Sequence, residues 1–507
     1  MIQFEKFVKS NSTYKFVFWT MVLAGVVFIM MSHPMMKLRF DIWQHLGSID
    51  DLVINPKADI ARANWYKIWA YLFRTLDIQD IRIYAVIIHR VQFLINCIVI
   101  YLSVAYLMSA LLLKKEQISA DFESKSNQKL WISSIALSGM LIWLTVIGTV
   151  STFQQAWIMW YSVNYQLTLP FLFLAISLFL HSVVVRQAKV AVYAKVICSL
   201  ILLLLIFLLH AGELVYLFAY LITGLVVFIN KDNIKQIFIV LCILLILVLI
   251  ASQFYSDRIP EIIHLIQSGQ TAKIADLIEE YGKYNIEGGN RYEANWNALY
   301  AVCVFCALPI LFIVRKNKNT VNSKVLFIVI ASLAYCFIPT FKVSSGIASL
   351  FYPAPIINRL YFASFLFVLP PLLFYLILKK SKKFNKPIYL LIFILVLMGL
   401  VAAYSRYVNQ GGTYFQNVHS IRNSLKPERV GIDLSAADID SVKLQIDAAK
   451  NQYGDSNIMF CANYDKSHIV QYVYRQKNIL FDRFAPHEVS DCVKNPKSKD
   501  KRIVYID

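Results

Sequence analysis

Acidic residues are scarce in this chain. Its 507 residues include 31 Asp and Glu against 50 Lys and Arg, which leaves a net charge of +19. In a soluble protein this excess would point to a nucleic-acid partner. Here the basic residues crowd short connections between apolar runs, as in the cytoplasmic loops of membrane proteins. The charge therefore does not indicate nucleic-acid binding, although part of it could serve an anionic lipid substrate.

The chain also lacks several informative motifs. It shows no internal repeat, which disfavours a transporter built from inverted halves. Its C-terminal region has neither a phosphate-binding glycine loop nor a catalytic serine motif. The first apolar run, residues 14–34, contains no small-residue cleavage site at its end, where Ser32-His33-Pro34-Met35 stands. We therefore expect this run to be retained as a membrane span.

Long apolar runs dominate what is present. The chain is 58% hydrophobic and its mean hydropathy is +0.56, whereas soluble proteins are about 45–50% apolar. Runs of about 20 apolar residues recur along it, so we predict a polytopic α-helical membrane protein with about eleven transmembrane helices. The predicted spans are 14–34, 86–113, 130–151, 165–185, 190–209, 211–229, 236–255, 296–314, 325–341, 360–378 and 387–404.

Charge in the connections predicts the topology. Basic residues occupy the N-terminus and every second connection, which places those segments in the cytoplasm. They are Lys6, Lys9 and Lys15, then Lys114-Lys115, Arg186 with Lys189, Lys231 with Lys235, Arg315 to Lys318, and Lys379 to Lys383. An odd number of spans then places the C-terminal tail outside. We expect a membrane module over residues 1–404 and an external domain over 405–507.

Two external segments are more than linkers. The first external loop, residues 35–85, carries apolar residues at spacings that suit amphipathic helices lying in the membrane interface. These are Trp43, Leu46, Ile49, Leu52, Trp65, Ile68, Trp69, Leu72 and Phe73. The fourth external loop, 256–295, has a helical core from Ile274 to Tyr281.

The sequence pattern of the tail predicts a small α/β domain. Buried strands are expected at Val430–Leu434, Ile458–Cys461 and Arg502–Ile506, with a helix from Ala437 to Asn451. Cys461 and Cys492 lie in this region and could form a disulfide if it is outside the cytoplasm. The other six cysteines lie in apolar runs and suit core packing, including Cys303 and Cys306 with their Cys-x-x-Cys spacing.

The candidate for proton chemistry directly follows the first apolar run. Asp41 and His45 are four residues apart and share a face if the segment is helical. Such a pair could supply a general base, or hold a metal, beside a hydroxyl acceptor. The alternative is a helix-capping Asp41 and an ordinary interfacial His45. Asp50-Asp51 is a weaker candidate, since one of the two could cap a turn.

Further candidates border the later spans. His210 and Glu213 occupy a short turn between two apolar runs, where polar groups are costly and tend to be functional; the alternative is a hairpin in which Glu213 caps the next helix. Lys342 and Arg359 border spans on the external side, against the charge rule. They could hold a phosphate, or could snorkel to lipid headgroups.

The segments beside these cations carry additional substrate-binding candidates. Tyr352 opens the stretch to Arg359, which two prolines stiffen. Arg291 follows a glycine pair and is a mobile-loop candidate for the phosphate. Tyr292 and Trp296 could stack on a sugar ring, although anchoring in the membrane interface is a common alternative.

Together these features resemble the GT-C superfamily of integral membrane glycosyltransferases. The resemblance rests on the many spans, the amphipathic first external loop with Asp41 directly after span one, and the small external C-terminal domain. It implies a bacterial inner-membrane protein whose donor is a sugar on a polyprenyl phosphate, usually undecaprenyl. It also implies that Asp41 acts as a base, or as a metal ligand, near a hydroxyl of an exported glycan, lipid or protein acceptor.

Two departures from that family bear on the cofactor. The second external segment, Thr152 to Asn164, has no carboxylate, and the tail lacks the tryptophan-rich acceptor motif of the metal-dependent oligosaccharyltransferases. A divalent metal is therefore in doubt, and a lipid-phosphate monosaccharide is the expected donor. We expect inverting transfer in which Asp41 deprotonates the acceptor and Arg359, with Lys342 or Arg291, holds the leaving phosphate.

Two other functions remain open from the sequence. An O-antigen or capsule polymerase or ligase has a similar number of spans but depends on arginine and histidine in a large late loop, which would make Arg291 central. A lipid or glycan transporter or flippase would need ionisable residues near mid-span. The chain offers few of these, since His181 and Glu213 lie close to span ends.

Overall fold

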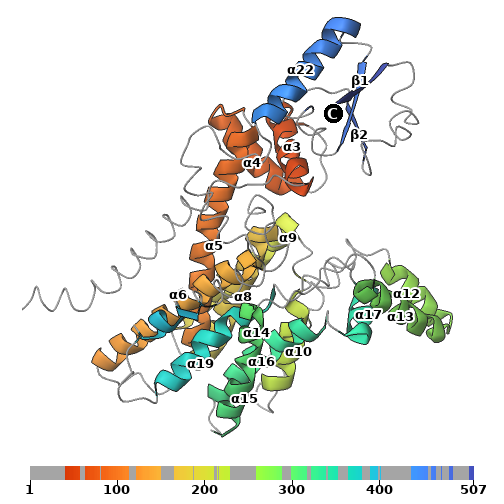
Figure 1. Ribbon diagram of the computed structural model, residues 1–507. Helices are drawn as coiled ribbons and strands as arrows, with labels where there is room; N and C mark the ends of the chain where they lie inside the picture. Colours follow the sequence, from red (N-terminus) through yellow and green to blue (C-terminus); the bar gives the residue numbers. More distant parts are fainter. Residues whose placement is uncertain are drawn as a thin grey trace, which may run out of the picture. The chain divides into compact units, whose positions relative to one another are not determined.

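The computed structural model is mostly helical (Figure 1). The residues it describes are 40–57, 63–79, 81–112, 122–149, 165–185, 188–210, 214, 216–228, 242, 258–287, 298–316, 321–338, 341–351, 363–379, 387, 389–394, 396–397, 400, 436–454, 458–463, 470, 479–482 and 502–506. The chain divides into two compact units, described separately below: residues 1–27, 93–158 and 164–416, and residues 28–92, 159–163 and 417–507.

Within the described part, three helices contain segments long and apolar enough to cross a membrane. They are α5 (Ile81–Leu112), α8 (Tyr165–Val184) and α9 (Lys189–His210), with the apolar segments Leu94–Leu112, Leu167–Val184 and Lys189–Leu209. Each coincides with a span predicted from the sequence. The apolar segment of α9 is only 22% buried against 61% for α8, so α9 turns most of its apolar surface outward.

Proline explains why two other predicted spans are not continuous α-helices. The run 296–314 divides into α14 (Ala298–Phe305) and α15 (Ala307–Lys316). The ring of Pro309 clashes with the carbonyl four residues earlier, which belongs to Phe305, the last residue of α14. The run 360–378 begins with the 3-10 helix η5 (Phe365–Val368) and continues as α19 (Leu369–Leu378), whose first turn holds Pro370 and Pro371.

The ends of α5, α8 and α9 meet through polar side chains. His181 of α8 lies between Lys195 of α9, 3.1 Å from its Nδ1, and Ser109 of α5, 3.2 Å from its Nε2. The C-termini of α5 and α8 and the N-terminus of α9 therefore lie at one level. This agrees with the chain directions predicted for these three runs.

An aromatic cluster joins further helices of the same unit. Tyr220 of α10 (Leu217–Phe228) donates a 2.7 Å hydrogen bond to the Ala363 carbonyl, and its ring packs against Tyr335 of α16 (Val321–Phe337). α6 (Phe122–Thr149) and α16 both pack on η5. Phe365 of η5 is fully buried. The bundle core is therefore built mainly from large apolar side chains.

The first external loop forms two helices, as its spacing predicts. α3 (Phe40–Ile54) and α4 (Ala63–Thr75) pack against each other. The apolar residues between them are buried, namely Leu46, Ile49, Leu52, Trp65, Trp69 and Phe73. Phe73 stacks on Tyr84 of α5 with ring centroids 4.2 Å apart. The two helices bury one apolar face in their own contact.

A second helical group forms from helices of residues 258–287 and 342–351. α12 (Arg258–Gln267) and α13 (Thr271–Glu287) are joined by a turn in which Gly269 adopts φ +69°, a conformation that suits glycine. α13 contains the predicted helical core Ile274–Tyr281. Both helices pack on α17 (Lys342–Phe351).

Two glycines bring α13 and α17 into backbone contact. A Cβ at Gly282 would collide with the Lys342 carbonyl oxygen, and a Cβ at Gly346 would collide with the Ile278 carbonyl oxygen. Both obstacles are backbone atoms, which a rotamer change cannot move. The two helices can approach this closely only where neither residue has a side chain.

Gly346→Ala is therefore expected to force α13 and α17 apart. Overpacking costs about 1–3 kcal/mol, so backbone amides of α13 should exchange hydrogen faster. Gly224→Ala is the matched control, since its Cβ would lie 3.6 Å from the Phe327 side chain, an ordinary contact. Equal exchange rates in the two variants would contradict the close backbone contact.

The tail domain contains a three-stranded parallel sheet in the order β2-β1-β3. The strands are β1 (Ile458–Asn463), β2 (Ile479–Asp482) and β3 (Arg502–Ile506). α22 (Ala436–Tyr453) covers one face, where Val442 and Ile446 join the core formed with Phe460. This confirms the helix and two of the predicted strands. β2 escaped the sequence analysis, and the predicted strand Val430–Leu434 lies outside the described residues.

The expected core packing is confirmed for Cys97, Cys303, Cys306 and Cys336, which are buried, and is wrong for Cys198, which is exposed on α9. Cys97, Cys198, Cys242, Cys303, Cys306 and Cys336 are free thiols. Cys461 of β1 is disulfide-bonded, and Cys492 lies outside the described residues. Disulfides persist in oxidising compartments, and the external placement of this domain stays a prediction.

Candidate functional site

Asp41 is the second residue of α3, so the segment that carries Asp41 and His45 is helical. Its side chain lies outside what the structure describes. A carboxylate in the first turn of a helix is stabilised by the helix dipole, but the second helical position is not that of an N-cap residue. The role of Asp41 as a general base stays a prediction.

His45, one turn later on α3, is held by α4. Its Nδ1 is 2.6 Å from the Tyr66 hydroxyl, and its ring packs edge-on against Trp65 with centroids 6.2 Å apart. The hydrogen bond links the two helices and fixes the ring orientation. His45 therefore has a positioning role in the α3–α4 pair, whatever chemistry it serves.

Asp50 and Asp51 differ sharply in their surroundings. Asp50 is 3% exposed, and the Tyr84 hydroxyl donates to its Oδ1 at 3.4 Å. The single hydroxyl hydrogen of Tyr84 is shared with the Ile78 carbonyl, 3.1 Å away. The contact between Asp50 and Tyr84 ties α3 to the start of α5. Asp51, the next residue, is exposed. We interpret Asp50 as a structural carboxylate, because it is buried and hydrogen-bonded, as polar groups of a packed core usually are.

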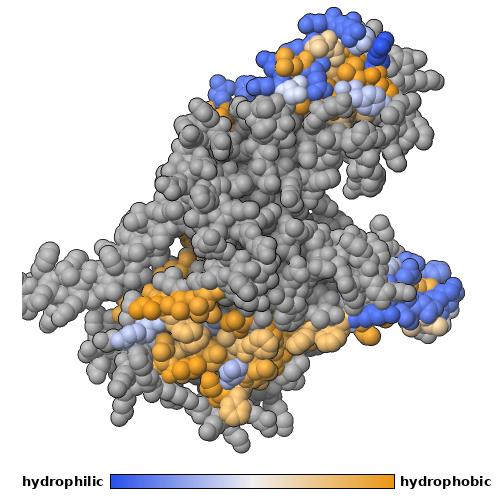
Figure 2. Space-filling view, in the orientation of Figure 1, coloured by the Kyte–Doolittle hydropathy of each residue, from blue (hydrophilic) through white to orange (hydrophobic). Residues whose placement is uncertain are grey.

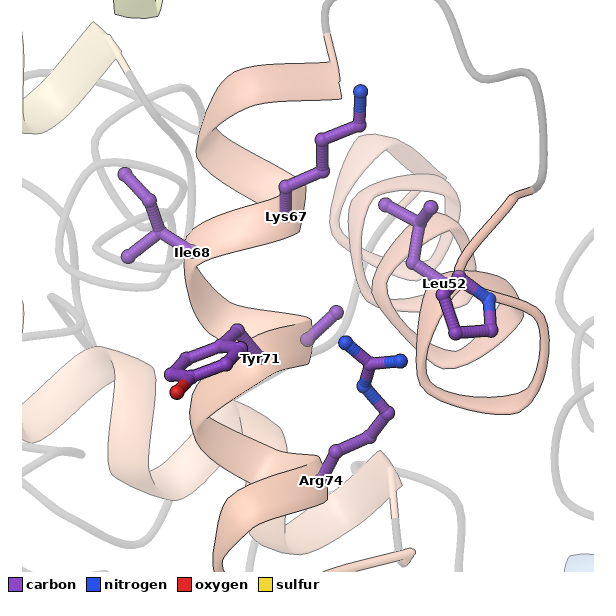
Figure 3. Close-up of a pocket in the computed structure, with 7 residues that line it drawn as sticks. Leu52, Lys67, Ile68, Tyr71 and Arg74 are labelled. Carbon is purple, nitrogen blue, oxygen red and sulfur yellow. The ribbon is translucent and has the colours of Figure 1, made fainter.

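A pocket of ≈ 480 Å³ lies on the surface of the α3–α4 pair. Figure 3 shows Lys67, Ile68, Tyr71 and Arg74 projecting from α4 and Leu52 from α3. The remaining lining residues are Pro56 and Ala70. The seven residues supply two cationic side chains, a phenol and an apolar wall, and none of them is acidic. This combination suits an amphiphile with a negatively charged head.

The polar pocket residues Lys67, Tyr71 and Arg74 were missed in the sequence, although a signal for them exists. Lys67, Tyr71 and Arg74 are spaced i, i+4 and i+7, which places them on one face of a helix. The apolar pattern of the loop drew attention to the buried face instead. Ile68 and Tyr71 are 59% and 67% exposed, so the face opposite the helix contact is itself partly apolar.

Lys342, a predicted phosphate ligand, begins α17 and has an acidic partner. Its Nζ is 3.1 Å from Oε1 of Glu279 on α13. Both side chains are exposed, and an exposed pair of this kind contributes about 0–1 kcal/mol. A phosphate could compete with the Glu279 carboxylate for Lys342 at low energetic cost.

The structure does not describe the side chains of the other predicted site residues. His210 is the last residue of α9, and its side chain lies outside the description. Glu213, Arg291, Tyr352 and Arg359, together with Tyr292 and Trp296, lie outside the described residues. Among the residues that are described, no three of His, Cys, Asp and Glu gather in a way that could hold a metal ion.

Comparison of the chain with protein-family models, with curated proteins and with solved structures finds no match.

Proposed function

We propose that this protein is a membrane glycosyltransferase that moves a sugar from a polyprenyl-phosphate carrier to a hydroxyl of an exported glycan, lipid or protein. The observation that carries the proposal is the cationic, partly apolar pocket on the α3–α4 pair, in which Asp41 is the second residue of α3. A lipid phosphate combines a negatively charged head with a long apolar chain. In the pocket, Lys67 and Arg74 could bind the charged head. Leu52 and Ile68 could contact the apolar chain.

The proposed reaction gives each of these groups a role. The acceptor oxygen attacks the anomeric carbon of the sugar, and the Asp41 carboxylate takes the hydroxyl proton. The bond between that carbon and the phosphate oxygen breaks, and its electrons stay on the phosphate. The leaving lipid phosphate gains negative charge, which Lys67 and Arg74 would stabilise. Because its negative charge is stabilised, the leaving phosphate does not need to be protonated by an acid.

Removing the two pocket cations tests the proposal. The double variant Lys67→Gln/Arg74→Gln is expected to bind undecaprenyl phosphate in nanodiscs about 10- to 100-fold more weakly, since a hydrogen bond to a charged group contributes about 1.5–3 kcal/mol. Titration with the lipid phosphate by native mass spectrometry measures the change.

Lys57→Gln is the matched control. Lys57 is an exposed lysine of the same loop that does not line the pocket, and its removal should leave lipid-phosphate binding unchanged. If the double variant and the control bind equally, the pocket is not the phosphate site. Sugar transfer that depends on Arg291 and not on Asp41 would favour a polymerase or ligase instead.

A further inference from the structure

α17 has its polarity reversed relative to a helix of a water-soluble protein. Ser345 and Ser349 are 0% and 1% exposed, whereas Val343 and Ile347 are 65% and 45% exposed. Burying serine while exposing valine and isoleucine is unfavourable in water. It is the usual arrangement in lipid, where small and polar residues form the protein contact and large apolar residues face the acyl chains.

The buried face of α17 packs closely against α13. Gly346 lies against the Ile278 carbonyl, and Gly282 of α13 lies against the Lys342 carbonyl. The two contacts are reciprocal, one helical turn apart on each helix. The face with Ser345, Gly346 and Ser349 is therefore fully occupied by its contacts within the chain, and the apolar face is the one left outward.

The apolar face is continuous with a candidate membrane span. α16 and α17 together pass the length and hydropathy requirements of a span, but they are bent by 91°. At the bend, the rings of Phe337 and Phe341 stack with centroids 5.9 Å apart, and both side chains are exposed. If α16 runs along the membrane normal, α17 runs along the membrane plane.

The helix that covers α17 is polar on its outer surface. α13 exposes Asp276, Glu279 and Glu280, and Figure 2 shows a hydrophilic surface over α12 and α13. The Lys342–Glu279 ion pair lies between the two helices. The α13–α17 pair thus exposes charge on one helix and apolar side chains on the other.

We propose that α17 is an in-plane membrane helix whose Val343–Ile347 face is immersed in the lipid interface, with α13 as its water-facing cover. The partner of this surface is the bilayer. An amphipathic helix in this position gains from burial of its apolar face among the acyl chains. The inference is independent of sugar transfer, because it rests on the bend and on the reversed burial pattern alone.

Depth measurement tests the orientation. A fluorophore is attached to Val343→Cys or Ile347→Cys of the full-length protein in phosphatidylcholine vesicles, and quenching by lipids spin-labelled at shallow or deep acyl positions gives its depth. For an in-plane helix the two positions should lie at equal, shallow depth. A helix continuing the direction of α16 would separate them by about 6 Å along the normal, from a rise of 1.5 Å per residue.

Labelling provides the control for exposure to water. Glu280→Cys on α13 should react with a membrane-impermeant charged maleimide at least tenfold faster than Val343→Cys or Ile347→Cys, with each site quantified on its own peptide by mass spectrometry because six native thiols are free. Fast labelling of all three positions, or absence of lipid quenching at 343 and 347, would overturn the proposal. Unequal depths at 343 and 347 would overturn the in-plane orientation.

Discussion

Asp41→Asn is expected to lower the rate of sugar transfer by about 10²- to 10⁴-fold, the usual contribution of a general base. The amide preserves the shape of the side chain but cannot accept the proton of the acceptor hydroxyl. Membrane insertion and binding of the lipid-phosphate donor should be unchanged, because the variant removes neither an apolar span nor the pocket cations. The measurement is incorporation of labelled sugar into exported acceptors at equal protein levels.

Asp51→Asn separates loss of a base from loss of a charge. Asp51 is an exposed acid on the same helix, so its replacement changes the net charge of α3 equally. Transfer should remain near normal in this control. Near-normal turnover by purified Asp41→Asn protein would remove Asp41 from the mechanism, and vesicles that move lipid without forming glycosyl product would favour a transporter.

Phe73→Ala is expected to have the largest effect on stability among the changes considered, about 3–5 kcal/mol, as for other buried aromatics. Phe73 is fully buried, and it stacks on both Trp69 and Tyr84. Its loss leaves a cavity where α4 meets the start of α5. Hydrogen exchange of α3 and α4 amides should accelerate at least a hundredfold, since each 1.4 kcal/mol corresponds to about tenfold.

Leu76→Ala is the control for Phe73→Ala. Leu76 directly follows α4 and is exposed, so its truncation should leave amide exchange in α3 and α4 nearly unchanged. If both variants exchange alike, α3 and α4 are not held together by the buried aromatic contacts. Their helicity would then come from the membrane surface alone.

The sequence predicted the helices of the first loop and the tail well because their apolar periodicity is a local property. α3, α4, α13 and α22 each coincide with a predicted helix, and β1 and β3 with predicted strands. β2, Ile479–Asp482, was not among the predicted strands. The breaks at Cys306 and before Pro370 were missed because an apolar run was treated as one helix without regard to its prolines.

The candidate site was only partly predictable. Asp41 and His45 could be selected because a span exit is visible in the sequence. The pocket cations Lys67 and Arg74 could have been selected from their shared helical face. The partners of His45 and Lys342 could not, because they lie 21 and 63 residues away along the chain.

The sequence by itself determined that the chain is apolar, that much of it is helical and that the acid at position 41 begins an amphipathic segment. Composition and periodicity suffice for this, because they reflect the solvent that each face of a helix requires. The tertiary structure alone decided that His45 is bound to Tyr66, that Lys342 is paired with Glu279 and that α17 turns its apolar face outward. These depend on contacts between distant segments, which local pattern does not encode.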